Sequence, residues 1–181
     1  THLLSKRSFL MSNNQSVCLV KARQHTPKLI RCNAFDEVLR EVPVSVAFYY
    51  GNHLNADALK LALETVLESF DLFAARLNYF DDKFCIDCRN QGVRFSVTQH
   101  DFMMTDIFAN QFDSKNNEVL FDLINPKTLI KKQDAVLTVQ VNYFEGTGMC
   151  LGLTWHHAIG DMQTFMCFMI AWSNQFSGKT F

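Results

Sequence analysis

The chain has 181 residues, of which 48% are hydrophobic and 19% are charged. These values are typical of one globular domain with a substantial core, and they exclude a collagen-like, coiled-coil or largely disordered chain. With 17 Lys and Arg against 18 Asp and Glu, the formal net charge is -1. This balance gives no general electrostatic reason to expect nucleic acid or an anionic membrane as a partner. The 17 Phe residues indicate a dense core or one large apolar face that meets another surface.

The cysteines show no spacing typical of a disulfide framework. Cys150 lies in a strand-like run and Cys167 in a helix-like run, so we expect both to be reduced core residues, which favours a cytosolic protein. Cys85 and Cys88 form a C-x-x-C pair, but no second ligand pair follows at zinc spacing. The surrounding segment is typical of a strand rather than of a helix start, which disfavours a thioredoxin-like motif. We therefore expect no metal or redox site there.

Neither a membrane span nor a signal peptide at residues 1–7 is expected from the sequence. No apolar run approaches the roughly 20 residues that a membrane span needs, and residues 1–7 lack the apolar stretch of a signal peptide. Because the first residue is Thr1, we expect the natural start upstream or at Met11. Residues 1–23 are interpreted as an N-terminal extension or tag-like segment plus the first strand, and residues 24–181 as the main domain.

In chain order, the first clear strand covers residues 44–50, where β-branched and aromatic residues run up to Gly51. A helix is expected to follow, because Asn55 is a good N-cap and apolar residues then recur at helical spacing. The apolar face of this helix comprises Leu59, Leu63, Val66 and Phe70.

Short strands are expected next over residues 77–80 and 84–87, joined by a turn at 81–82. Residues 93–97 alternate between apolar and polar side chains, which predicts another strand. Residues 113–117 are typical of a loop.

The last third of the chain has the strongest patterns. Residues 125–126, Asn-Pro, indicate a turn. Two strands are expected over 136–144 and 149–155, joined by a hairpin over 145–148. Residues 162–172 are apolar nearly all round, which predicts a buried helix. With no repeat or linker, the pattern favours one α/β domain with a mixed or antiparallel sheet.

One segment carries candidate reactive chemistry, residues 152–162 with the sequence G-L-T-W-H-H-A-I-G-D-M. It lies where a strand is expected to end and a helix to begin, which can hold a side chain rigidly at a cavity. His156 and His157 are adjacent and point in different directions, so only one is expected to face a substrate. A neutral imidazole, with a pKa near roughly 6.5, can take a proton from a hydroxyl or an amine. Asp161 suits the start of the helix as a carboxylate.

The residues alone leave other interpretations of this motif open. A His-His pair is often polar surface or a satisfied core pair, and an H-x-x-x-D spacing arises by chance. Zinc would need a third ligand that is not obvious in the sequence. Local chemistry therefore allows catalysis without establishing it.

Five elements resemble a known family in their order and spacing. They are residues 26–27 with 32–36, 59–63 with 72–77, 86–95, 139–161 and 172–173. Together they resemble the N-terminal part of the BAHD acyltransferases, the H-x-x-x-D family of acyl-CoA-dependent transferases, over roughly residues 24–178. The resemblance implies a chloramphenicol-acetyltransferase-like two-layer α/β fold with a mixed, largely antiparallel sheet and packed helices. Residues 24–181 would then be the N-terminal acyltransferase domain.

The resemblance implies a mechanism for this motif. His157 would be the general base that deprotonates a hydroxyl or, less favoured, an amine acceptor. The acceptor then attacks the thioester of acyl-CoA directly, without an acyl-enzyme. Asp161 would point away from substrate and hold the shape of the site, commonly through an arginine, while His156 and Gly160 support the turn. Arg76 is expected to be structural. No metal and no cofactor is implied, only acyl-CoA as co-substrate and a small-molecule acceptor.

The chain also departs from the family pattern. Met162 stands where the family usually has Gly, and we expect activity to survive this change. Leu72 and Ala75 replace a Pro and a Gly of the family pattern at structural positions. The second domain, with its D-F-G-W-G motif, is absent from this chain. We therefore expect the chain to be inactive alone and to be completed by a C-terminal domain on a second chain or in a missing part of the same protein. The resemblance further implies a cytoplasmic enzyme of secondary metabolism.

Three alternative hypotheses about the function of the chain stay open. One is a homotrimeric enzyme similar to chloramphenicol acetyltransferase, which the oligomeric state would identify. Another is a condensation-type domain that uses carrier-protein thioesters, which transfer from free acyl-CoA would exclude. The third is a non-catalytic acyltransferase-like module that binds a partner through an apolar face, which a lack of thioester turnover would favour.

Overall fold

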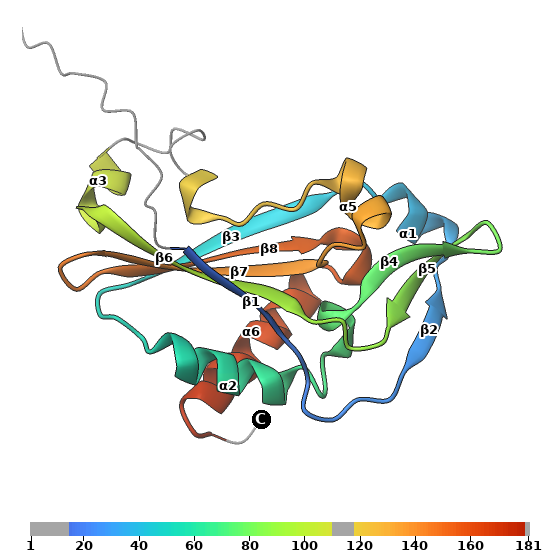
Figure 1. Cartoon of the computed structure of the whole chain (residues 1–181), viewed down its shortest axis with the longest axis horizontal. Helices are drawn as coiled ribbons and strands as arrows, with labels where there is room; N and C mark the ends of the chain where they lie inside the picture. The colour runs from blue at the N-terminus through green and yellow to red at the C-terminus, as the bar shows by residue number, and fades with distance from the viewer. Residues whose placement is uncertain (1–14, 110–117, 180–181) are drawn as a thin grey trace, which may run out of the picture.

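The computed structural model describes residues 15–109 and 118–179. A five-stranded sheet forms the centre of the molecule, and a smaller three-stranded sheet adjoins one end of it (Figure 1). The loop expected over residues 113–117 lies outside the described residues, as does most of the N-terminal extension.

The large sheet is mixed, with the strand order β1-β6-β7-β8-β3. Only the β6–β7 pair is parallel, and the other neighbours are antiparallel. Strand β8 lies between β7 and β3, and all eight of its residues are buried. The predicted strands are therefore confirmed, and β1 is the strand expected within residues 1–23. The bounds are β1 (Gln15–Val20), β3 (Pro43–Tyr50), β6 (Val93–Met103), β7 (Leu137–Glu145) and β8 (Met149–His156).

The small sheet is antiparallel, with the order β2-β5-β4. The turn between its last two strands is the one predicted from the sequence, and Asp81 and Asp82 both adopt the left-handed conformation, with φ of 49° and 57°. Cys85 and Cys88 lie within β5, which confirms that the C-x-x-C pair is in a strand. The strands are β2 (Lys28–Arg31), β4 (Arg76–Phe80) and β5 (Lys83–Cys88).

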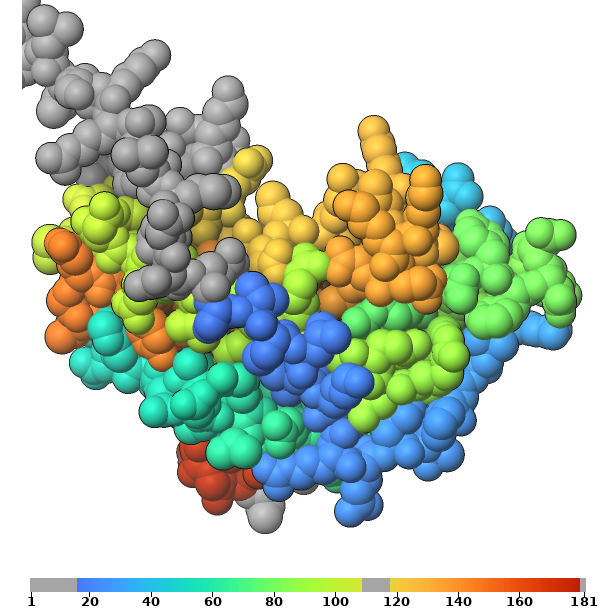
Figure 2. Space-filling view, viewed as in Figure 1, coloured from blue at the N-terminus to red at the C-terminus, as the bar shows by residue number. Residues whose placement is uncertain are grey.

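Two helices, α2 (Ala56–Val66) and α6 (Met162–Phe176), pack against each other on one face of the large sheet (Figure 1). In the space-filling view α2 lies beside β1 on the surface (Figure 2). Asn55 caps α2 as predicted, since its side chain accepts from the Ala58 N–H at 2.9 Å. Phe70 was expected on this helix, but α2 ends one turn earlier. Phe70 instead precedes a 3-10 turn, η1 (Asp71–Ala74), and packs its ring on Phe168.

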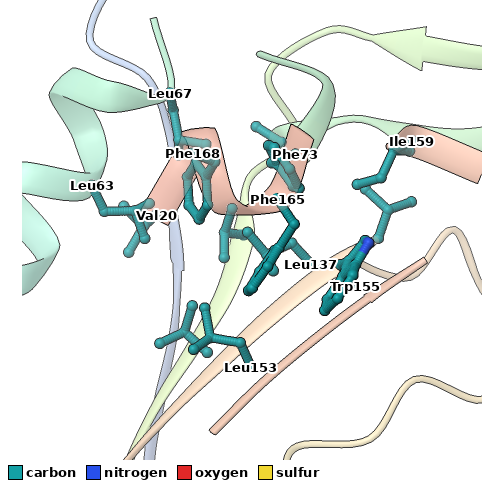
Figure 3. Close-up of a cluster of buried hydrophobic side chains, with 14 of the residues drawn as sticks. Val20, Leu63, Leu67, Phe73, Leu137, Leu153, Trp155, Ile159, Phe165 and Phe168 are labelled. Atoms are coloured by element: carbon teal, nitrogen blue, oxygen red, sulfur yellow. The ribbon is translucent and has the colours of Figure 1, made fainter. Parts of the chain in front are cut away.

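The main core fills the space between the large sheet and these helices (Figure 3). Trp155 of β8 stacks on Phe165 of α6, with ring centroids 3.9 Å apart and an interplanar angle of 6°. Phe168, one turn further along α6, packs on Phe73 at 4.5 Å. Fully burying one such side chain contributes about 1.5–3 kcal/mol, so these rings fix α6 on the sheet.

The prediction that α6 is buried all round is wrong. Met162, Met166 and Ile170 are 48%, 38% and 57% exposed and recur every four residues along one face. Cys167 is also exposed, in contrast to the expected core position, whereas Cys150 is buried as predicted. A helix that packs on one sheet face leaves its far side free whatever its composition, and uniform hydropathy cannot show which side that is.

The opposite face of the sheet carries an irregular segment that polar side chains of β7 hold in place. The Gln140 side chain donates to the Val119 carbonyl at 2.7 Å, and the Asn142 side chain donates to the Leu120 carbonyl at 3.0 Å. The Asn-Pro turn expected at 125–126 is instead the start of a helix: Asn125 is its N-cap and Pro126 its first residue. The remaining short elements are α1 (Ala34–Val38), α3 (Met104–Ala109), η2 (Glu118–Leu120) and α5 (Pro126–Lys132).

Gly152 of β8 permits the close approach of this segment. A Cβ atom built at Gly152 would lie 1.9 Å from the Leu120 carbonyl oxygen. Because Leu120 is held by its hydrogen bond with Asn142, the backbone has little freedom to retreat.

We predict that Gly152→Ala destabilises the fold by about 1–3 kcal/mol, as overpacking of a core does. Gly51→Ala is the matched control, because no atom lies within 4 Å of the corresponding Cβ position. Urea unfolding of the two variants measures the difference. Equal stability of the two variants would contradict the tight contact described here.

Candidate active site

The candidate motif lies in a short turn between the central strand and the core helix. Strand β8 ends at His156, a 3-10 turn η3 (His157–Ile159) follows, and Asp161 caps the N-terminus of α6. The expected position at a strand end and a helix start is therefore confirmed. The two histidines differ sharply in their surroundings.

His156 is fully buried, and both of its ring nitrogens are engaged. Its Nδ1 accepts a hydrogen bond from the Ala158 N–H at 3.3 Å, which leaves Nε2 to carry the proton and donate to the Arg40 carbonyl at 2.7 Å. Burial lowers the pKa of His156 and favours the neutral ring. A ring with both nitrogens occupied in this way cannot serve as a free base.

His157 is only half-buried, and its backbone rather than its ring is anchored. Its N–H donates to the Val42 carbonyl at 2.9 Å, and its carbonyl accepts from the Gly160 N–H at 3.3 Å. Its Nδ1 is buried and forms no hydrogen bond in the structure. A buried polar atom without a hydrogen bond lowers the stability of the fold by about 1–3 kcal/mol. The presence of a histidine at position 157 therefore needs an explanation other than stability. His157 is thus the member of the pair whose ring is available for chemistry.

Asp161 is exposed and acts on the helix rather than on His157. Its Oδ1 accepts from the Thr164 N–H at 2.8 Å. Hydrogen bonds from Thr164 lower the pKa of Asp161, and the nearby His157 lowers it further. Among the described residues, no arginine forms an ion pair with this carboxylate. The hydrogen bond of Asp161 therefore shapes the first turn of α6.

Trp155 links the turn to the hydrophobic core, a role that the sequence did not suggest. Its indole N–H donates to the Gly160 carbonyl at 3.0 Å, while its ring is held against Phe165. Gly160 has an extended backbone conformation that any residue can adopt. A side chain at this position lacks space, because a Cβ atom there would lie 2.8 Å from Cγ2 of Thr164. A buried Trp needs a partner for its N–H, and this rule is the signal that could have identified Trp155.

Arg40 and Val42 are the functional contributors that sequence reasoning missed entirely. They lie between α1 and β3 and act through their carbonyl oxygens, which hold His156 and His157 respectively. Because every residue has a carbonyl, no side-chain type at these positions could have indicated the role.

Arg76 is not part of this turn. It is buried and donates to the carbonyls of Gln133 at 2.9 Å and Gly92 at 2.8 Å, and also to that of Ala75. Burial lowers its pKa. These bonds tie together the edges of several elements, which accords with the structural role expected of Arg76.

Other chemistry is sparse in the part of the chain that the structure describes. Over residues 15–109 and 118–179, no group of three or more His, Cys, Asp or Glu side chains is arranged to hold a metal ion. The six cysteines are all free. In the same ranges, none of the helices combines the length and the apolar character needed to cross a bilayer.

Comparison with known proteins identifies the family. The model of the family described as "Transferase family" matches residues 15–180. Vinorine synthase of Rauvolfia serpentina is 25% identical over 175 residues, which is 90% of this chain and 41% of that protein. A limonoid 21-O-acetyltransferase of Melia azedarach is 28% identical over 164 residues, or 85% of this chain and 37% of that protein. The chain therefore spans about two fifths of the length of these relatives.

Solved structures show the same fold. The crystal structure of vinorine synthase superimposes with a TM-score of 0.76 at 21% identity, over 93% of this chain and 44% of that one. TRI101 of F. graminearum, complexed with ethyl coenzyme A, gives a TM-score of 0.70 at 14% identity, over 86% of this chain and 40% of that one. The expected chloramphenicol-acetyltransferase-like α/β fold is thereby confirmed. Since the family model covers most of its length, the chain belongs to the Transferase family, that of the BAHD acyltransferases.

Proposed function

We propose that this chain provides the N-terminal half of an acyl-CoA-dependent acyltransferase in which His157 is the general base for a hydroxyl acceptor. The observation that carries the proposal is the contrast within the pair: His156 has both ring nitrogens occupied, whereas His157 keeps an unpartnered ring on an anchored backbone. The names of the relatives support acetyl transfer to oxygen, since one is a limonoid 21-O-acetyltransferase. TRI101, which shares the fold, was crystallised with coenzyme A and T-2 mycotoxin.

The proposed reaction needs one base and no covalent intermediate. The ring of His157 takes the proton of the acceptor hydroxyl as the acceptor oxygen attacks the thioester carbonyl carbon. The carbon–sulfur bond then breaks, and the imidazolium returns the proton to the departing thiolate. The products are an ester and free coenzyme A, and His157 ends the cycle neutral. An amine acceptor would follow the same path and is the less favoured alternative.

The neighbours of His157 are proposed to position it. His156 holds the turn to the Arg40 carbonyl, and Gly160 lets the backbone pass close to Thr164. Asp161 fixes the start of α6 through its cap. No metal or cofactor takes part in this scheme, and acyl-CoA is a co-substrate.

A second domain is proposed to complete the site. Apolar side chains are exposed on α1 and on the free face of α6. Helix α6 follows the His157 turn along the chain, and the residues just after α1 hold that turn through the carbonyls of Arg40 and Val42. A second domain, on another chain or in the rest of the same protein, would cover such surface and supply the opposite wall of a tunnel. The chain alone is then inactive. The exposed apolar residues of α1 and α6 are Phe35, Val38, Met162, Met166 and Ile170.

We also propose a cytoplasmic location and a role in secondary metabolism. The free cysteines accord with a reducing compartment.

We predict that His157→Ala lowers acyl transfer by about 10²–10⁴-fold, because a general base typically contributes that much. The measurement is the release of coenzyme A thiol by the native full-length protein, with a panel of acyl-CoA thioesters and hydroxyl acceptors. His53→Ala is the control, since His53 lies beside β8's opposite end and bonds the Gly148 carbonyl. Near-normal turnover by the His157 variant would sink the assignment.

Asp161→Ala should cost about 0.5–2 kcal/mol of stability, because it removes the N-cap of α6. It should also reduce turnover, since the cap shapes the turn that presents His157. Asp161→Ser restores an acceptor for the Thr164 N–H and should recover most of both losses. Asn55→Ala removes the cap of α2 and serves as the matched control, with a similar stability loss and unchanged turnover. If the Ser variant behaved like the Ala variant, the capping role would be wrong.

The pH dependence of stability should report the neutral state of His156. Because burial lowers its folded pKa, the unfolded chain takes up the proton first as the pH falls. The stabilisation is complete above the unfolded pKa of roughly 6.5 and is lost as the pH falls through the lower folded pKa, at a slope of at most about 1.4 kcal/mol per pH unit. We predict a shallower slope in His156→Gln, measured by urea unfolding between pH 8 and pH 5. A slope equal to that of the wild type would contradict a buried neutral ring.

A further inference from the structure

An apolar cavity of about 200 Å³ lies between α2, α6 and the large sheet. Its walls come from the end of β3, the middle of β8, the approach to α2 and the C-terminal half of α6. The lining includes Tyr50, Leu54, Leu151, Trp172, Ser173 and Ser177. Trp172 is almost fully buried, and its N–H is held by the Leu59 carbonyl at 3.0 Å, so this wall is rigid.

The cavity is separate from the candidate active site. Along β8, Leu151 precedes His157 by six residues, or roughly 20 Å of extended strand. Along α6, Trp172 follows Asp161 by eleven residues, or roughly 16 Å of helix. The proposed transfer mechanism uses none of the side chains that line the cavity.

The size of the cavity limits its occupant. An apolar cavity of about 150 Å³ stays dry and binds benzene, whereas drug-sized ligands need about 300–1,000 Å³. A volume of about 200 Å³ therefore suits one six-membered ring with a small substituent.

The lining also offers hydrogen bonds that the protein leaves unused. The hydroxyl groups of Tyr50, Ser173 and Ser177 form no hydrogen bond with any described residue. Ser173 and Ser177 are exposed and mark the mouth, while Tyr50 is half-buried. Three available hydroxyls beside an apolar, partly aromatic wall are the features that recognise a ring bearing one polar group.

We propose that this cavity is a binding site for a compact one-ring compound that carries a hydroxyl group, such as a simple phenol. The ring lies among Leu54, Leu151 and Trp172, and its hydroxyl bonds to Tyr50 or to the serines at the mouth. The inference is independent of acyl transfer by His157.

The test is the binding of p-cresol and toluene to the native full-length protein, followed by ligand-observed NMR and by Trp fluorescence. Ser173→Trp places a bulky ring at the mouth and should weaken p-cresol binding at least tenfold. Cys167→Trp is the matched control, because Cys167 lies on the same helix, is exposed and does not line the cavity. It should leave binding unchanged, as should His157→Ala.

Tyr50→Phe separates the polar contact from the apolar one. It should weaken p-cresol binding several-fold and leave toluene binding unchanged. If Ser173→Trp fails to fold, Ser177→Trp at the exposed end of α6 replaces it. Failure of both probes to bind at millimolar concentration would overturn the proposal, as would unaltered p-cresol binding in a folded mouth variant.

Discussion

The geometry of the candidate site depends on the buried indole of Trp155. Its face is stacked on Phe165 and its N–H is bonded to the Gly160 carbonyl, so one side chain connects the apolar core to the turn that carries the histidines. Burial of the stacked rings stabilises the position of the indole, and the hydrogen bond from the indole to Gly160 fixes the backbone of the turn. The site is thus rigid because the core beneath it is rigid.

The second constraint comes from the segment between α1 and β3. The carbonyls of Arg40 and Val42 hold the ring of His156 and the backbone of His157. The two adjacent histidines therefore differ in function. Both ring nitrogens of His156 form structural hydrogen bonds, whereas the ring of His157 forms none with the residues that the structure describes. Helix α1 buries none of its residues, and in the proposed function a second domain would cover it.

Much of this could be predicted from the sequence where local patterns decide. Strands β7 and β8, the cap at Asn55 and the position of His157 at a turn are all predicted from local residue patterns. The errors arise where tertiary packing decides. Hydropathy could not show that Met166 faces outward, and an Asn-Pro pair fits a helix start at Pro126 as well as a turn. The roles of Arg40 and Val42 could not be predicted, because their backbone carbonyls form the contacts and every residue has a carbonyl.

The most direct test of the central claim is native mass spectrometry of the purified protein with an acyl-CoA added, alongside a denatured spectrum. The proposal predicts that the chain is found joined to, or in complex with, a second domain of similar or larger mass, and that this species retains coenzyme A. A homotrimer of 20.8 kDa chains would contradict it, because the site would then lie between identical subunits.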